Sequence, residues 1–464
     1  MTTIHTSPTY LPPISNSISI KVKAMKILKF GGTSVGSPQR MKDVCQLITD
    51  GERKIVVLSA MSGTTNSLVE IADYIKKHNA EGASSVINKL RTLYRQHVEE
   101  LYAQPENVKK TDDLLHDIFM HLHELTTHDF SDKLEKEILA QGELMSTNMV
   151  TNYLKECGIK VMLIPALNFM ATDANGEPDM GYIKEHLNNI LKQNPNYDLY
   201  ITQGFICRNH KGDIDNLQRG GSDYTACLIG AVLRADEIQI WTDIDGMHNN
   251  DPRFVPSTTP VRQLNFEEAA ELAYFGAKIL HPTCIQPAHY AGVPVRLLNT
   301  MDPSAPGTII NDQMQKGTIK AVAAKDNITA IKIVSSRMLL ATGFLHKLFE
   351  TFEVNHTPVD MVTTSEVGVT LTIDNNAHLA NIVEELKKYG TVSIDENMCI
   401  ICVVGDLRWG NVGFETLVTE AMANIPVRMI SYGGSNHNIS FLIRESDKKA
   451  ALCALSEKLF NTKK

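Results

Sequence analysis

Between residues 26 and 310 the sequence alternates short apolar runs with longer amphipathic runs, and this alternation limits the possible folds more than any other feature. The apolar runs are rich in Ile, Val and Leu, so each one predicts a buried strand. They cover residues 26–30, 54–60, 160–166, 198–206, 237–244 and 293–299. The intervening runs have helical spacing, including a long helical section over 83–156. We therefore expect an α/β domain over 25–310, with a mainly parallel sheet sandwiched by helices and ligands at the carboxyl ends of its strands.

The pattern changes after about residue 311, where an internal repeat begins. Residues 359–374 align loosely with residues 427–446, and Met361 and Met429 occupy matching places. Each copy lies between two helical stretches, which predicts two α+β units of βαββαβ type. The second unit ends before its final strand, whereas a spare strand over 317–324 precedes the first unit. We expect the units to be interleaved, and the two expected domains are residues 326–396 and residues 311–325 plus 397–464.

Composition and charge exclude several classes of protein. The 464 residues are 43% hydrophobic, which is enough for two to four packed domains. The net charge of -8 argues against nucleic acid or an anionic membrane as the main partner. No apolar run approaches the ~18 residues of a membrane helix. The eight scattered cysteines favour a reducing cytoplasm.

Residues 1–24 are expected to be a disordered extension, or translated sequence ahead of a start at Met25. They hold three prolines and lack the apolar core of a signal peptide.

Two spacings resemble metal or redox sites, and for both we favour a structural explanation. Cys399 and Cys402 lie three apart in a continuous apolar strand, so their side chains point to opposite faces and belong to the core. His121 and His123 lie two apart in a polar helical region, where they do not share a face, so they are expected at the surface.

The stretch KFGGTSVGS (29–37) follows the first predicted strand and precedes a helix start at Ser37-Pro38. It matches neither the Walker phosphate loop, which needs a lysine after its glycines, nor the dinucleotide fingerprint. Gly31 and Gly32 still let backbone N–H groups approach an anion, and Lys29 can point at the same phosphates. The stretch predicts an anion site, although a plain strand–turn–helix has the same pattern.

Other polar stretches suit the same site. In LQRGGSDYTACLIG (217–230), Arg219 can grip a carboxylate with two hydrogen bonds beside a helix N-terminus. The polar loop after the strand in IWTDIDGMHNNDPR (240–253) suits a nucleotide, whereas an ordinary long loop is the alternative. Lys278 in AYFGAKILHP and Glu143 in LAQGELMST are ordinary surface residues when each is considered alone.

These motifs occur together and in a fixed order: KFGGTSVG, VVLSAMSGTTN, QGELMST, TQGFI, RGGSDYTA, WTDIDG…DPR and FGAKILHP. In this combination the sequence resembles the aspartokinase family over residues 25–310, and the resemblance continues through two regulatory ACT units to the end. It implies the amino-acid-kinase fold and transfer of the γ-phosphate of ATP to the β-carboxylate of L-aspartate. It also implies Mg²⁺ bound through the ATP phosphates rather than by protein ligands.

The resemblance implies a role for individual residues. Lys29 would stabilise the transferring phosphoryl group, Glu143 would pair with the substrate ammonium, and Arg219 would take its carboxylate. The implied catalytic residues are Lys29, Asp223 and Lys278. The implied ATP contacts are Lys29, Phe30, Gly31, Gly32, Thr242, Asp243, His248, Arg253 and Lys278. The implied aspartate contacts are Ser59, Thr65, Glu143, Phe205, Arg219, Gly220, Gly221 and Ser222. His248 stands where the family often has tyrosine, and Gln218 where it usually has glycine.

For the repeat, the resemblance implies feedback inhibition by L-lysine and a homodimer formed through the ACT units. The implied effector residues are Met338, Gly343, Phe344, Leu345, Asp360, Ser365, Glu366 and Val367. Physically, N–H groups at a helix start suit a carboxylate, and Asp360 and Glu366 suit an amine. Threonine or no effector are the alternatives, and the helical spacing of Phe344 with its neighbours is also that of core residues.

The expected activity is therefore the first step of lysine, threonine and methionine biosynthesis. A side-chain carboxylate is already ionised at pH 7 and needs no general base, which agrees with a site of lysines and arginine. An amino-acid kinase of another substrate and a catalytically inactive amino-acid sensor are the two alternatives.

Overall fold

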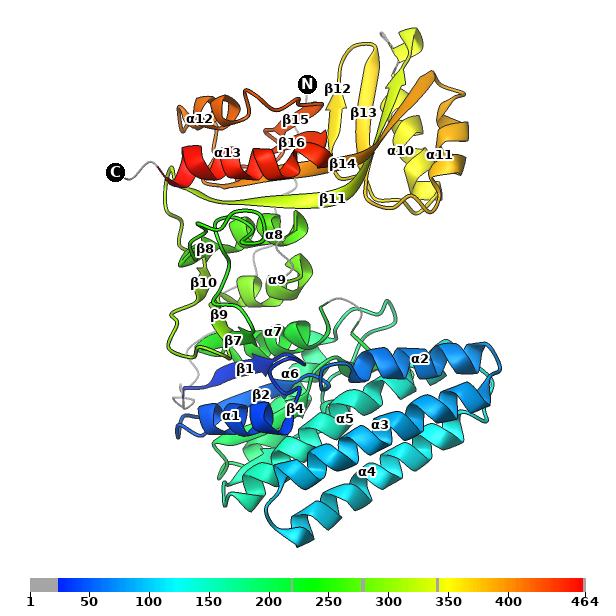
Figure 1. Ribbon diagram of the computed structural model, residues 1–464, viewed down its shortest axis with the longest axis vertical. Helices are drawn as coiled ribbons and strands as arrows, with labels where there is room; N and C mark the ends of the chain where they lie inside the picture. Colours follow the sequence, from blue (N-terminus) through cyan, green and yellow to red (C-terminus); the bar gives the residue numbers. More distant parts are fainter. Residues whose placement is uncertain (1–23, 218–219, 277–279, 339–341, 462–464) are drawn as a thin grey trace, which may run out of the picture.

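The computed structural model describes residues 24–217, 220–276, 280–338 and 342–461. Figure 1 shows a lower unit, in which helices surround one sheet, and an upper unit built on two long strands. Helix α8 (Phe266–Tyr274) and helix α9 (Pro282–Ala291) lie between them. In the described part of the chain, no helix combines the length and the apolar composition needed to cross a membrane.

The lower unit contains an eight-stranded sheet with the order β3-β4-β2-β1-β7-β9-β10-β8. Its strands are β1 (Lys26–Phe30), β2 (Lys54–Leu58), β3 (Val161–Leu163), β4 (Leu199–Gln203), β7 (Glu237–Thr242), β8 (Gln263–Asn265), β9 (Val295–Asn299) and β10 (Thr308–Asn311). All neighbours pair in parallel except β9 and β10. The predicted mainly parallel sheet is confirmed. The six predicted runs correspond to β1, β2, β3, β4, β7 and β9, apart from shifts at their ends.

Helices cover both faces of this sheet because side chains alternate along each strand. In β1, Ile27 belongs to one apolar core, whereas Leu28 and Phe30 belong to the core on the other face. The remaining helices of the unit are α1 (Pro38–Ile48), α2 (Thr64–Lys76), α3 (Ala80–Leu101), α4 (Pro105–Leu125), α5 (Asp132–Glu156), α6 (Met180–Gln193) and α7 (Gly221–Leu233). The predicted helical section over 83–156 is three helices, because Pro105 starts α4 and Ser131 caps α5.

A two-stranded hairpin of β5 (Ile206–Arg208) and β6 (Ile214–Asn216) follows β4 directly. The predicted run 198–206 therefore contains all of β4 and the first residue of β5. Among the described residues there are also three short 3₁₀ turns: η1 (Ala166–Asn168), η2 (Ser336–Met338) and η3 (Glu445–Asp447).

The upper unit is one six-stranded sheet with the order β12-β13-β11-β14-β16-β15. Its strands are β11 (Ile319–Val334), β12 (Val362–Thr364), β13 (Gly368–Ile373), β14 (Thr391–Gly405), β15 (Met429–Tyr432) and β16 (Asn438–Arg444). Its helices are α10 (Phe344–Val354), α11 (Leu379–Leu386), α12 (Phe414–Ala421) and α13 (Lys448–Phe460). The spare strand is the first half of β11, and residues 319–325 pair with residues 400–405 of β14.

The predicted separate strands are joined end to end. Residues 317–324 and 328–335 form one strand, β11, and residues 391–395 and 399–405 form another, β14. The register of the two strands shifts between Lys325 and Ile328, where the two halves meet. The sheet is therefore continuous across both repeats, as Figure 1 shows. We propose that residues 326–396 form one domain of the upper unit and that residues 311–325 and 397–464 form the other.

One apolar core continues from the lower unit through α8 into the upper sheet. Met361 and Met429, the matching residues of the repeat, both lie in this core. Cys402 also belongs to it, whereas Cys399 belongs to the core on the other face beside α12 and α13. Both cysteines are thus core residues on opposite faces, as predicted. His121 lies on α4, where its ring contacts Glu137 at 2.9 Å.

Candidate functional site

Lys29 and Asp223 form an ion pair at the carboxyl end of the large sheet. Lys29 is the fourth residue of β1, and Asp223 lies in the first turn of α7. The Lys29 ammonium lies 2.7 Å from Asp223 Oδ1, and the two side chains are only 12% and 16% exposed. The two residues lie far apart in the sequence, and the parallel sheet of the lower unit brings them together.

The glycines after β1 have two different functions. A Cβ at Gly31 would lie 3.5 Å from the Lys29 ammonium, so the absent side chain leaves space beside that charge. A Cβ at Gly32 would lie 2.9 Å from the carbonyl oxygen of Ala60. Gly32 is therefore needed for the close packing of the loops that follow β1 and β2. Ser62 N–H also donates to the Gly32 carbonyl at 3.1 Å.

Ser59 follows β2, and its hydroxyl donates to the hydroxyl of Ser222 at 2.9 Å. Ser222 is buried in the first turn of α7, next to Asp223. Gly204 permits this contact, because a Cβ there would lie 2.3 Å from the Ser222 side chain. The loops after β2 and β4 therefore meet the start of α7 beside the Lys29–Asp223 pair. Thr65 lies exposed in the first turn of α2.

Glu143 lies in α5 and is 5% exposed. Burial raises the pKa of its carboxyl to about 7, although the N–H of Ala60 and the charge of Lys29 both oppose that rise. The Ala60 N–H donates to Glu143 Oε1 at 3.2 Å. A carboxylate that is buried at this cost is suited to a cationic partner, because a bound ammonium would restore its ionised form.

Phe205 lies after β4 in a left-handed conformation, with φ of 66°. Its ring packs on Gly221, where a Cβ would lie 3.3 Å from the ring. Gly220 is the N-cap of α7 and is left-handed too, with φ of 66°. A Cβ at Gly220 would lie 1.8 Å from the Cys284 sulfur on α9, so α9 closes over this turn.

The loop after β7, residues 243–253 and called the β7 loop below, leaves the same edge of the sheet. Thr242 is half-buried and Asp243 is exposed. His248 Nε2 lies 2.7 Å from Asp245 Oδ1, and its Nδ1 lies 2.9 Å from the hydroxyl of Thr258. The Arg253 side chain is 78% exposed and is held by the Asp251 carboxylate at 2.6 Å. Thr300 N–H donates to the Thr242 carbonyl at 2.8 Å, which joins the ends of β7 and β9.

Together these residues form a site with two chemical halves. One half holds a cation, Lys29, beside open space, which suits a phosphate. The other half holds a buried carboxylate, Glu143, near paired serine hydroxyls and a helix N-terminus, which suits a small zwitterion. Within the described ranges, no group of three or more His, Cys, Asp or Glu side chains is arranged to hold a metal ion.

Several known proteins are similar to this chain in sequence and fold. Residues 24–299 match the amino acid kinase family, and residues 401–459 match an ACT domain. The chain is 35% identical to chloroplastic aspartokinase 1 of Arabidopsis thaliana over 469 residues, which cover 94% of this chain and 80% of that protein. It is 32% identical to lysine-sensitive aspartokinase 3 of Escherichia coli K12 over 447 residues, or 94% and 99% of the two chains.

Solved structures agree with these sequence matches. E. coli aspartokinase III in complex with aspartate and ADP superposes with a TM-score of 0.80 at 32% identity, covering 94% of this chain and 100% of that one. The same enzyme in complex with lysine and aspartate gives a TM-score of 0.78, with 94% and 99% coverage.

The chain belongs to the aspartokinase family.

Two residues to which the aspartokinase resemblance assigns roles, Arg219 and Lys278, lie outside the described residues, as does Gln218. Gly276 lies just before residues 277–279. It packs on the six-stranded sheet of the upper unit, called the regulatory sheet below because it includes the ACT match, and a Cβ at Gly276 would lie 2.2 Å from the carbonyl oxygen of Ala324.

The effector residues predicted for this aspartokinase surround the start of α10 and the hairpin of β12 and β13. Gly343 is the left-handed N-cap of α10, with φ of 81° and no side-chain cap. Phe344 is buried, and Met338 packs against the same core. Three more predicted residues are exposed in the hairpin turn or its flank: Ser365, Glu366 and Val367. Leu345 is 40% exposed.

Asp360, which the sequence suggests as a partner for an amine, already has a cationic partner within the chain. Its side chain is 1% exposed and pairs with Lys325 at 2.7 Å. The Tyr274 hydroxyl donates to the same oxygen, Oδ1, at 2.6 Å. The other oxygen, Oδ2, is buried without a hydrogen-bond partner. This carboxylate therefore joins α8 to the regulatory sheet and still has one acceptor to offer.

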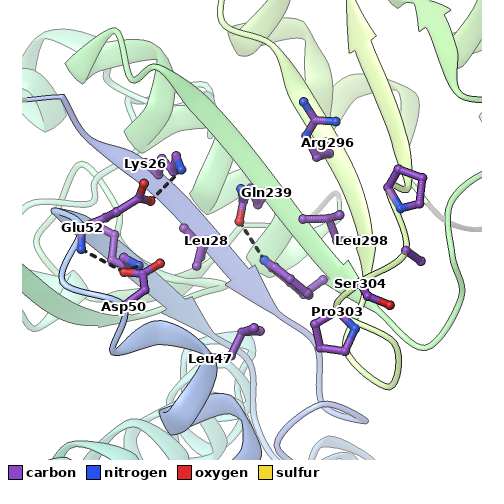
Figure 2. A pocket seen from close by; sticks show the side chains of 14 residues that line it. Lys26, Leu28, Leu47, Asp50, Glu52, Gln239, Arg296, Leu298, Pro303 and Ser304 are labelled. Carbon is purple, nitrogen blue, oxygen red and sulfur yellow. Dashed lines mark hydrogen bonds and ion pairs between the residues drawn. The ribbon is translucent and has the colours of Figure 1, made fainter.

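A cavity of about 390 Å³ on the large sheet is not part of the site (Figure 2). Leu28 and Trp241 line it, whereas Lys29, next to Leu28 in the strand, points to the opposite face. The charges at its rim are already paired, with Lys26 2.6 Å from Glu52 and Arg296 held by Glu237. The cavity therefore offers no uncompensated charge to a phosphate or an amino acid.

The sequence did not predict several buried residues that contact the candidate site residues or pack against them. The Gln203 amide donates to the hydroxyl of Thr147 at 2.8 Å, and the hydroxyl of Ser146 donates to the Ser59 carbonyl at 2.8 Å. Cys284 was also missed, because it lies in a short helix with no motif of its own. What distinguishes Ser146, Thr147, Gln203 and Cys284 is their burial, and a single sequence does not show which polar side chains are buried.

Proposed function

We propose that this aspartokinase transfers the γ-phosphoryl group of ATP to the β-carboxylate of L-aspartate. The observation that carries the proposal is the Lys29–Asp223 ion pair beside the buried Glu143 carboxylate, at the carboxyl end of a parallel sheet. An isolated phosphate site does not require Glu143, and an amino-acid site does not require Lys29. Their combination suits a substrate with an ammonium group that receives a phosphoryl group. The structure of E. coli aspartokinase III with aspartate and ADP supports the same assignment.

The chemistry needs positioning and charge stabilisation rather than a general base. The β-carboxylate of aspartate has a pKa near 4, so it is an ionised nucleophile at pH 7. One P–O bond to the leaving ADP breaks as one P–O bond to the carboxylate forms. The role of Lys29 is to neutralise charge that develops on the phosphoryl oxygens. Asp223 orients the Lys29 ammonium through the 2.7 Å contact.

Glu143 and the serine pair hold the substrate. The buried Glu143 carboxylate would bind the substrate ammonium, and the Ser59–Ser222 pair would line the space at the start of α7. Magnesium, bound through the ATP phosphates, would supply additional positive charge. Thr242, Asp243, His248 and Arg253 would contact the nucleotide from the β7 loop. Arg219 and Lys278 keep the roles that the resemblance gives them.

The activity is tested by trapping the product. An acyl phosphate reacts with hydroxylamine, so the purified chain should form aspartyl hydroxamate from aspartate, Mg²⁺ and ATP. Reactions without ATP, or with glutamate in place of aspartate, are the controls. Product from glutamate but not aspartate would favour another amino-acid kinase. No product from any acid, with lysine still binding, would favour a sensor.

We also propose that L-lysine inhibits this activity. Lysine-sensitive aspartokinase 3 and the E. coli structure with lysine and aspartate support lysine as the effector. The buried, unpartnered Oδ2 of Asp360 is an acceptor for an amine, and the uncapped start of α10 at Gly343 is suited to a carboxylate. A dose–response curve tests the assignment, and unchanged turnover at millimolar lysine would refute it.

We propose a homodimer formed through the ACT units, and sedimentation at two protein concentrations would test it. The product would be the acyl phosphate that enters lysine, threonine and methionine synthesis. A location in the cytoplasm stays a prediction from the cysteine usage.

A further inference from the structure

The β7 loop is built onto the regulatory unit. The first half of β11 pairs with β14 on one side only, because β13 reaches just the second half, Thr329–Val334. On the other side, the N–H of Val322 donates to the carbonyl of Asn249 at 2.9 Å. A residue of the proposed nucleotide loop thus accepts a hydrogen bond from one N–H on the open edge of the regulatory sheet.

Asn250 makes a second connection, to the last helix of the chain. It is 3% exposed, and its side-chain amide donates to the Leu452 carbonyl in α13 at 2.9 Å. Its side-chain oxygen accepts from the N–H of Asp251 at 2.8 Å. The same side chain therefore links α13 to the next residue of the loop.

The chain of contacts ends at Arg253. The Asp251 carboxylate accepts from Arg253 Nε at 3.0 Å and from Nη2 at 2.6 Å, and it also accepts from the Arg253 backbone N–H at 2.9 Å. Arg253 has no comparable contact with the rest of the loop among the hydrogen bonds of the described residues, so Asp251 sets its direction. Three successive links thus run from Leu452 through Asn250 and Asp251 to Arg253.

The residues after the β7 loop are held by the same helix. The Lys448 ammonium lies 4.2 Å from the centre of the Phe254 ring, and it pairs with Asp326 at 2.6 Å. The Cys453 thiol contacts the Phe254 carbonyl at 3.7 Å. Val255 belongs to the apolar core between the sheet and α12 and α13. Both sides of the Asp251–Arg253 pair are therefore anchored to α13.

We propose that Asn250 is a positioning residue through which α13 orients Arg253 toward the phosphates of ATP. The C-terminal helix then sets the affinity for ATP, without touching the aspartate half of the site. This inference rests on the proposed function, because it assumes that Arg253 contacts ATP. Asn250 itself does not contact the substrates.

The test compares steady-state kinetics and ATP binding by calorimetry for three variants: Asn250→Ala, Arg253→Ala and the double variant. Loss of the buried hydrogen bond between Asn250 and Leu452 should raise KM and Kd for ATP about tenfold in Asn250→Ala. KM for aspartate should stay within twofold of the wild-type value. In the Arg253→Ala background, Asn250→Ala should have no further effect on KM for ATP, because Asn250 acts only through Arg253.

Several outcomes would overturn the inference. These are independent, additive effects of the two substitutions, an equal rise in both KM values, and a lower Tm with unchanged ATP binding.

If Asn250→Ala does not fold, Lys448→Met weakens the same contact between the loop and α13 from the side of the helix. It should raise KM for ATP about threefold, whereas the exposed neighbour Lys449→Met should not. Equal KM values in these two variants would also contradict the inference. Failure of the wild-type chain to phosphorylate aspartate would instead contradict the proposed function.

Discussion

The Lys325 ammonium lies 2.7 Å from Asp360 Oδ1, so the proposed effector carboxylate already has a cationic partner within the chain. Asp374 contacts the same ammonium at 2.9 Å, and the hydroxyl of Tyr274 in α8 donates to Asp360 Oδ1. Burial lowers the pKa of Lys325, but its hydrogen bonds to Asp360 and Asp374 outweigh this effect, and the net pKa is raised. A lysine ligand must therefore compete with Lys325 or use the free oxygen beside it.

Removal of this internal competitor should make the enzyme more sensitive to lysine. In Lys325→Met the buried Asp360 charge lacks its cation until the effector amine arrives, so binding the amine becomes more favourable. We expect half-maximal inhibition at about tenfold lower lysine, with kcat in the absence of lysine nearly unchanged. Inhibition curves measure the shift, and Lys332→Met on the same strand is the control. A shift to higher lysine would show that Lys325 supports the effector rather than competing with it.

Lys29→Ala should abolish most of the turnover while the protein folds normally. In the proposed mechanism Lys29 stabilises the transferring phosphoryl group, and loss of one such preorganised group costs about 10²- to 10³-fold in kcat. Its removal also leaves Asp223 unpaired, which adds repulsion toward the phosphates. The hydroxamate assay gives kcat, and circular dichroism reports the fold. Wild-type turnover in a folded Lys29→Ala protein would remove Lys29 from the mechanism.

Affinity for aspartate should fall as the pH is lowered through 7. Burial raises the Glu143 pKa to about 7, so this group is largely neutral at pH 6 and no longer attracts an ammonium. The substrate carboxylates remain ionised at that pH. We expect KM for aspartate to rise by up to about tenfold per unit below pH 7 and to level off above pH 8. Glu143→Gln should show a high KM that is independent of pH. A wild-type KM that is constant from pH 5.5 to 8.5 would exclude this role.

Gly204→Ala should damage both stability and the aspartate half of the site. The added Cβ would lie 2.3 Å from the Ser222 side chain and 2.7 Å from its Cα, where the helix backbone cannot easily yield. Overpacking of this kind costs about 1–3 kcal/mol. Thermal unfolding and KM for aspartate are the measurements. Gly410→Ala is the control, because nothing lies within 4 Å of a Cβ at that position.

The fold was predictable wherever local pattern decides it. The apolar run at 26–30 is β1, and Ser37 caps α1, with its hydroxyl accepting from the N–H of Arg40 at 3.3 Å. The repeat placed Met361 and Met429 in equivalent positions, and both lie in the same apolar core. In each case the signal lies within a few residues of the element that it specifies.

What was not predictable depends on contacts between distant residues. From the sequence, Glu143 is expected to be a solvated helical glutamate. Its burial could not be predicted, because residues on several faces of α5 are buried and no clear polar face marks which side chains reach solvent. The fusion of the repeats into one sheet depends on β11 and β14 running end to end. The Asn250–Leu452 contact joins residues 202 positions apart. In the sequence, Asn250 looks like an ordinary loop asparagine.

Glu143 should also make the stability of the protein depend on pH. Because the native pKa is raised from about 4.5 to about 7, the folded chain binds more protons than the unfolded chain between these values. Stability therefore falls as the pH rises from 4.5 to 7, and the cost of the buried charge is constant above pH 7. Glu143→Gln carries no such cost, since its amide oxygen can still accept from the Ala60 N–H. Its Tm relative to the wild type should increase between pH 5 and pH 7 and then level off. A difference in Tm that does not vary with pH would show that Glu143 is ionised throughout this range.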